Sequence, residues 1–193
     1  MPLKKLLDVP RNKLLGLITI IAGFLFFLLT FLVFTPIESD LKGSTGYGVM
    51  EFEFAWTSEN INKIFTAWGQ SGINKQIFAT WIDFLYILCY GFFFAGLILL
   101  ITRKLEGKSQ EIGLYMTLLP FIAGIFDTIE NINLLLMLTN ESFIWSASPF
   151  IASLCASIKF GLLILALIFF IISLILVLIR RIKQILFFII YSF

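Results

Sequence analysis

Residues 162–177 have the sequence LLILALIFFIISLILV, in which Ser173 is the single polar residue. This stretch lies inside a longer apolar run, residues 147–179, which ends at Arg180 and Arg181. A helix of about 20 apolar residues is long enough to cross the roughly 30 Å hydrocarbon core of a bilayer. The run therefore predicts a transmembrane helix. Because it has about 33 residues, we expect this helix either to tilt or to project from the membrane.

The composition of the whole chain indicates the same class of protein. Of its 193 residues, 60% are hydrophobic and 13% are charged, and the mean hydropathy is +1.01. Soluble domains carry about 25% charged residues, and a core of this size cannot bury 23 Phe side chains. We expect an all-α integral membrane protein that forms a single domain over residues 1–193 and binds no nucleic acid.

Several kinds of site are excluded by the residue types present. The chain has no His, which removes the commonest general base and metal ligand. Its two cysteines, Cys89 and Cys155, are far apart in sequence and form no CxxC motif, so neither a thioredoxin-like pair nor a zinc knuckle is available. We therefore expect no metal site and no cofactor.

Three further apolar runs lie before residues 147–179 in the chain. The four predicted spans are residues 14–35, 77–101, 113–138 and 147–179, with a kink in the third span at Pro120. They predict a four-transmembrane-helix bundle.

The Lys and Arg residues outside the spans predict the orientation. Ten lie on the side of the two termini and three on the opposite side, and basic residues favour the cytoplasm. We expect a bacterial cytoplasmic membrane with both termini cytoplasmic. Residues 36–76 then form an exported loop, and residues 180–193 form a cytoplasmic tail that lies along the membrane surface.

The exported loop begins with a region of turns and an apparent strand. Gly43, Gly46 and Gly48 predict the turns. In residues 50–54, Met and Phe alternate with Glu, and this period of two predicts an extended segment with its apolar side chains on one face.

An amphipathic helix is predicted after the extended segment. Thr57 or Ser58 can cap it and Gly69 can end it, and apolar residues recur between them at helical spacing. These apolar residues are Ile61, Ile64, Phe65 and Trp68. Either the loop simply packs on the ends of the spans, or the helix is a lid whose Ile61, Phe65 and Trp68 face down over a cavity that opens outward.

Polar residues inside the spans indicate where a site can lie. The second span carries a polar stripe, and the third carries a denser one. The first stripe contains Gln76, Thr80, Asp83, Tyr86 and Tyr90, and the second contains Asp127, Glu130 and Asn131. A charge in the middle of a bilayer costs at least about 2.5 to 3.5 kcal/mol. We therefore expect Asp83, Asp127 and Glu130 to converge in the outer half of the bundle, with Asn131 and Tyr86 as hydrogen-bonding support.

Lys159 is the one cation within the predicted spans. It either pairs with the carboxyls or extends to the outer headgroups. The fourth span has two faces that suit helix packing, one made of small residues and one that carries Lys159. The first consists of Ser153, Ser157 and Gly161, and the second of Ala152, Cys155, Ala156 and Lys159. The sequence leaves open which face points inward.

A combination of motifs in residues 50–138 resembles a known family. The motifs are Glu53-Phe54-Ala55, Trp68-Gly69, Asp83-Phe84-Leu85, Leu119-Pro120 and Asp127-x-x-Glu130-Asn131. They resemble those of a set of small, largely uncharacterised four-span membrane proteins found mainly in bacteria. The resemblance implies a fold and a shared site region without implying an activity. A looser likeness, of architecture only, is to the emopamil-binding and sterol-isomerase group, whose motifs this chain lacks.

Two functions fit these features. In the first, the protein binds or acts on a small amphiphile or lipid, whose apolar body lies in the bundle and whose polar or cationic group meets the carboxyls. The candidate ligand-binding residues are Asp83, Asp127, Glu130, Asn131, Tyr86, Tyr90 and Lys159. In the second, it is a non-enzymatic accessory or assembly protein in which the same residues lock the bundle and the loop binds a membrane-protein partner. A channel is disfavoured because the inner halves of the first and fourth spans are almost wholly apolar.

Overall fold

Long apolar runs form long helices in this chain, because a helix satisfies its own backbone hydrogen bonds in a solvent that offers none. The computed structural model describes residues 2–140 and 147–191, and the side chains of residues 3–140 and 147–187. Every regular element in these ranges is a helix. The elements are η1 (Pro2–Leu7), α1 (Asn12–Leu29), η2 (Thr30–Phe34), α2 (Thr35–Thr45), α3 (Val49–Glu53), α4 (Ser58–Thr102), α5 (Gly107–Met116), α6 (Leu119–Thr139) and α7 (Ser148–Tyr191).

Four helical units in the described ranges are long and apolar enough to cross a membrane. They are Asn12–Thr45, Ser58–Thr102, Gly107–Thr139 and Ser148–Phe187. The prediction of an all-helical chain with four such helices is confirmed. Many of their large apolar side chains face outward, including Ile20, which is 70% exposed, and Leu32, which is 68% exposed. Such a surface suits lipid as the surrounding solvent.

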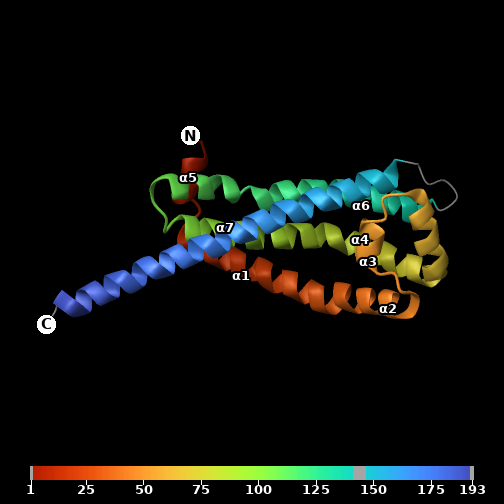
Figure 1. Cartoon of the computed structure of the whole chain (residues 1–193), viewed down its shortest axis with the longest axis horizontal. Helices are drawn as coiled ribbons and strands as arrows, with labels where there is room; N and C mark the ends of the chain where they lie inside the picture. The colour runs from red at the N-terminus through yellow and green to blue at the C-terminus, as the bar shows by residue number, and fades with distance from the viewer. Residues whose placement is uncertain (1, 141–146, 192–193) are drawn as a thin grey trace.

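The two ends of the bundle carry different elements. Figure 1 shows both termini, η1 and the connection between α4 and α5 at one end, and α2, α3 and the first turns of α4 at the other. We call the second of these the α2–α3 end. Of the three basic residues at that end, Lys42 pairs with Glu51, Lys63 with Glu59 and Lys75 with Asp40.

The predicted loop over residues 36–76 is mostly helical. η2 is a π-helical turn that joins α1 to α2 without a break, and α2 ends at Gly46, whose φ of 81° favours glycine. The prediction of an extended segment over residues 50–54 is wrong, because these residues belong mainly to α3. The Glu51 carboxylate accepts a 2.8 Å hydrogen bond from the Gly48 backbone N–H and so closes the first turn of α3. As a result Phe52 is buried, at 1% exposed, while Met50 is 45% exposed.

The helix predicted after Thr57 is present as the first part of α4. The Thr57 hydroxyl accepts a hydrogen bond from the Asn60 N–H, and Gly69, with φ of 58°, kinks the helix without ending it. The part before the kink runs across the end of the bundle (Figure 1). α4 then turns into the bundle and continues to Thr102.

The third membrane-length unit is interrupted where the sequence predicts a kink. α5 ends at Met116 and α6 begins at Leu119, with Pro120 in its first turn. Proline cannot donate a backbone hydrogen bond, so it is tolerated in a first turn and breaks a continuous helix.

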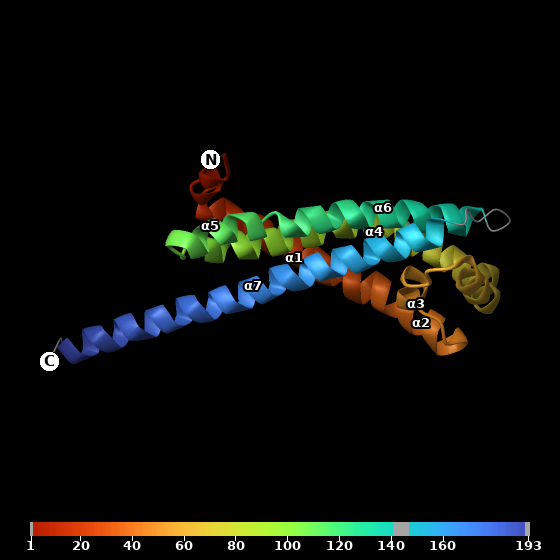
Figure 2. The same ribbon diagram turned by 45° about the horizontal axis from the view of Figure 1, so that its top comes forward.

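α7 is a single helix that is longer than the predicted span. It continues without a break past Arg180 to Tyr191, so the described residues show no separate tail after residue 179; residues 192–193 lie outside them. Its 44 residues correspond to about 66 Å, roughly twice a hydrocarbon core. Figure 2 shows the C-terminal half of α7 leaving the other helices and projecting past the end of the bundle where the termini lie.

Candidate functional site

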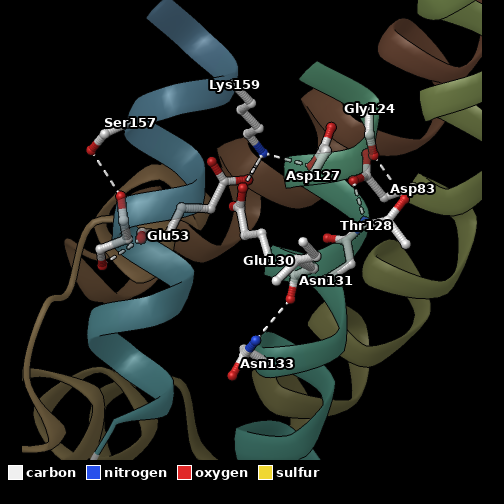
Figure 3. Close-up of polar contacts among 12 residues, drawn as sticks. Glu53, Asp83, Gly124, Asp127, Thr128, Glu130, Asn131, Asn133, Ser157 and Lys159 are labelled. Carbon is white, nitrogen blue, oxygen red and sulfur yellow. Dashed lines mark hydrogen bonds and ion pairs between the residues drawn. The ribbon is translucent and has the colours of Figure 1, made fainter. Parts of the chain in front are cut away.

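Lys159 is the centre of a buried ion network. Its ammonium Nζ lies 2.8 Å from Asp127 Oδ1, 2.8 Å from Glu130 Oε2 and 3.6 Å from a Glu53 carboxylate oxygen. The Lys159 residue is 5% exposed, and Glu130 is completely buried. The network therefore ties α7 to α6 and α3 (Figure 3).

The face of α7 that carries Lys159 points into the bundle. Ala152 and Ala156 on this face are 1% and 0% exposed, and such small side chains let α7 approach α6 closely. By contrast, nothing lies within 4 Å of the position that a Cβ would take at Gly161, on the alternative face. Ser153 is buried as well, because its hydroxyl donates to the Glu53 carbonyl and accepts from the Trp56 N–H. Of the two orientations that the sequence leaves open, the structure has Lys159 facing the carboxyls.

Asp127 and Glu130 differ in how fully they are satisfied. Asp127 accepts hydrogen bonds at both oxygens, from Lys159 at 2.8 Å and from the Tyr90 hydroxyl at 2.9 Å. Glu130 forms an ion pair with Lys159, but the geometry of this contact is not that of a hydrogen bond. Neither oxygen of Glu130 has a hydrogen-bond donor among the described residues. A buried acceptor without a donor is costly, so Glu130 depends on the Lys159 charge.

Asp83 lies beside this network and is not ion-paired within the described residues. It accepts a 2.7 Å hydrogen bond from the Asn131 amide. Asn131, which the sequence analysis expects to support a carboxyl, thus lies beside Asp83. The Tyr86 hydroxyl instead bonds the Thr30 hydroxyl of η2 at 3.1 Å, and does not support a carboxyl in the way that the sequence analysis expects.

A cavity of about 580 Å³ borders these side chains. Its wall contains charged and polar side chains together with aromatic and aliphatic ones. The polar lining includes Glu38, Glu53, Gln76, Asp83, Asp127 and Lys159, and the apolar lining includes Phe26, Phe34, Phe94, Phe160 and Leu163. The cavity is thus built from α1, η2, α2, α3, α4, α6 and α7.

Gln76 adds an unsatisfied acceptor to the polar wall. The residue is 2% exposed, and its amide nitrogen donates to the Thr80 hydroxyl at 3.2 Å. Its carbonyl oxygen Oε1 is buried and has no donor among the described residues. Polar atoms this deeply buried are normally paired, so the Gln76 oxygen is an exception within the bundle.

The lid predicted from Ile61, Phe65 and Trp68 does not cover this cavity. None of the three lines it; they are buried instead in an apolar core with Leu134 and other residues of α6. The rim at this end consists of Glu38, Ser39, Val49 and Met50, from α2 and α3. The α2–α3 pair therefore borders the cavity at this end, and Trp68 donates a 2.7 Å hydrogen bond to the carbonyl of Tyr47, which lies between α2 and α3.

The electrostatics of the site are dominated by an excess of carboxyls. Four of them, Glu53, Asp83, Asp127 and Glu130, lie around the single ammonium of Lys159. Burial raises the pKa of the Glu53 carboxyl, and the opposing attraction of Lys159 does not cancel this effect. No three His, Cys, Asp or Glu side chains in the described part of the chain are arranged to hold a metal ion.

Glu53 is the network residue that sequence reasoning missed. Hydropathy predicts that Glu53 lies in the loop between the first two spans, and the alternation of Glu with Phe suggests an extended segment. Nothing in this local pattern connects Glu53 to Lys159. Its place in the motif Glu53-Phe54-Ala55 is the one signal that singles it out. Gln76 is in the predicted stripe, but its unpaired oxygen depends on side-chain geometry.

No family model, curated protein or solved structure matches the chain. The function must therefore be argued from the cavity and the charges around it.

Proposed function

We propose that the protein is a membrane protein that binds a small amphiphile or lipid in the cavity between α2, α3, α4, α6 and α7. The observation that carries this proposal is a cavity that is lined both by carboxyls and by aromatic and aliphatic side chains. A volume of about 580 Å³ is within the range of pockets that hold small organic ligands, roughly 300 to 1,000 Å³.

The polar groups of the cavity are not all needed to hold the helices together. Lys159 already joins α3, α6 and α7 through three carboxyls, and this part of the cluster supports the structural alternative, an accessory protein whose network locks the bundle. Asp83 is different, because it lines the cavity and has one hydrogen-bond donor, Asn131, and no ion pair among the described residues. A ligand that donates a hydrogen bond from the cavity would complete the bonding of Asp83.

The proposal includes an orientation. With the termini on the cytoplasmic side of a bacterial cytoplasmic membrane, the α2–α3 end and the cavity rim face the exported side. In a background without Cys89 and Cys155, a Ser44→Cys variant should react with an impermeant maleimide added to intact cells. A Lys108→Cys variant should react only after the cells are opened. The reverse pattern would invert the topology.

Binding is tested by what co-purifies with the protein. Ala79 is 2% exposed and lines the cavity, so Ala79→Leu should partly fill it, whereas Ala67→Leu adds the same bulk at an exposed position of α4. Native mass spectrometry should find a stoichiometric amphiphile on the wild type and on Ala67→Leu, and much less on Ala79→Leu. Asp83→Asn, which keeps the shape of the side chain, serves as a second variant in case Ala79→Leu does not fold.

The structural alternative predicts another result. If the wild type carries no amphiphile, or if folded Ala79→Leu and Asp83→Asn carry as much as Ala67→Leu, the cavity is not the binding site and the locking role is favoured.

A further inference from the structure

We propose that the polar end of the ligand is a cation with N–H donors, an ammonium or guanidinium group, which binds on the cavity side of Asp83 and Glu53. This inference rests on the proposed function and specifies the chemical class of its ligand. It is drawn from the charge balance of the cavity, the supply of donors and acceptors on its polar wall, and the way in which Lys159 is bound.

The charge balance favours a cation. Among the described residues that line the cavity, Lys159 is the single Lys or Arg, whereas Glu38, Glu53, Asp83 and Asp127 contribute carboxyls. The charge of Lys159 is already compensated by three carboxyls, so Lys159 would attract an anionic group only weakly. An anionic head group would therefore find no free cation among the described residues of this wall, whereas a bound cation would favour the ionised form of the carboxyls beside it.

The hydrogen-bonding groups of the polar wall favour donors on the ligand. Among the described residues that line the cavity, the Gln76 carbonyl oxygen and Glu53 Oε2 are buried without a donor, and Asp83 has a single donor in Asn131. The wall offers few free donors in return, since the Gln76 amide donates to Thr80 and the Tyr90 hydroxyl to Asp127. An ammonium brings three N–H donors and a guanidinium five, which suits a wall rich in acceptors.

Lys159 shows how the cavity accommodates an ammonium. Its Nζ lies among carboxylates and 5.0 Å from the centre of the Phe160 ring, a cation–π distance. Asp83 lines the cavity together with the rings of Tyr86 and Phe34, whose centres are 4.7 Å apart. A second ammonium would therefore find a carboxylate and aromatic rings there, and its apolar body would extend along Phe26, Phe94 and Leu163.

The test compares probes with one alkyl chain and different head groups. Full-length protein in a maltoside detergent is titrated at pH 7 with decylamine, decyltrimethylammonium, decanol and decanoate, with affinity measured by calorimetry. The shared chain keeps the apolar contribution to binding similar across the set. We expect decylamine to bind about ten- to a hundredfold more tightly than decanol, from hydrogen bonds to charged groups, with decyltrimethylammonium between them and decanoate weakest.

The matched variants locate the head group. Asp83→Asn should bring the affinity for decylamine close to that for decanol, while Asp8→Asn, the same change at an exposed position near the N-terminus, should leave it unchanged. If decanol or decanoate binds as tightly as decylamine to the wild type, the cationic class is wrong and the cavity remains an amphiphile site. If none of the four probes binds, both the class and the proposed function fail.

Discussion

Replacing Lys159 by Met should be among the most destabilising single changes in the chain. Methionine has a similar length and no charge, so the variant leaves Asp127, Glu130 and Glu53 facing one another without their shared cation. Removing one partner of a buried ion network typically costs about 3 to 5 kcal/mol. For a chain of this size that corresponds to a fall in melting temperature of about 6 to 20 °C.

The assay is thermal unfolding in detergent, and the control is Lys63→Met, which removes an exposed lysine paired with Glu59 on α4. Exposed pairs of this kind contribute little, so the control should melt with the wild type. Adding Asp127→Asn and Glu130→Gln to Lys159→Met should recover part of the loss, because two of the three carboxyls that lost their cation are then neutral and only Glu53 can still carry a charge. The loss should also shrink at low pH, where protons neutralise the carboxyls. If Lys159→Met melts together with Lys63→Met, the buried network does not stabilise the bundle and our account of it is wrong.

Two further predictions concern helix packing and pH. A Cβ at Gly96 of α4 would overlap Thr19 of α1, so Gly96→Ala should lower the free energy of unfolding by about 1 to 3 kcal/mol. Gly161→Ala, in the open part of α7, should raise it by roughly 0.5 to 1 kcal/mol. Equal melting temperatures for the two variants would contradict this packing. Burial raises the pKa of Glu53 above its usual value of 4.5, so the folded state holds this proton more tightly than the unfolded state does. The stability that this proton provides is complete below pH 4.5 and is lost as the pH rises through the raised pKa. Glu53→Gln should therefore melt with a weaker pH dependence above pH 4.5, and parallel melting curves against pH for the variant and the wild type would refute it.

The membrane-length helices could be predicted because hydropathy acts over many residues. A run such as residues 162–177 has one stable form in lipid, whatever its neighbours do. The ends of helices depend on local contacts and were harder to predict. α3 is helical because Glu51 bonds back to Gly48, which the alternation of Phe and Glu does not reveal, and α7 passes Arg180 without a cap or breaker to stop it.

The sequence predicts the candidate site only in part, because helical spacing shows which side chains share a face but not which groups pair between helices. Helical spacing places Asp127, Glu130 and Asn131 on one face of α6 from sequence alone. Which groups then pair depends on the rotation of α7 about its axis and on the position of α3, and neither leaves a periodic signal. The pairing of Lys159 with Glu53 and the unpaired Gln76 oxygen are therefore visible only in three dimensions.

The proposed binding role of the cavity and a locking role of the ion network are compatible in this architecture. A cavity between helices stays open only if the helices around it are held apart and fixed, and the Lys159 network fixes α6, α7 and α3 from one side of the space. Asp83 faces the same space from α4, where its carboxyl is bonded through Asn131 to α6 without entering the ion network. A ligand that binds Asp83 then finds its partners already in position and loses less affinity to ordering them. The variants that separate the two roles are therefore the ones at Lys159, which should change stability, and at Asp83, which should change binding in a bundle that remains folded.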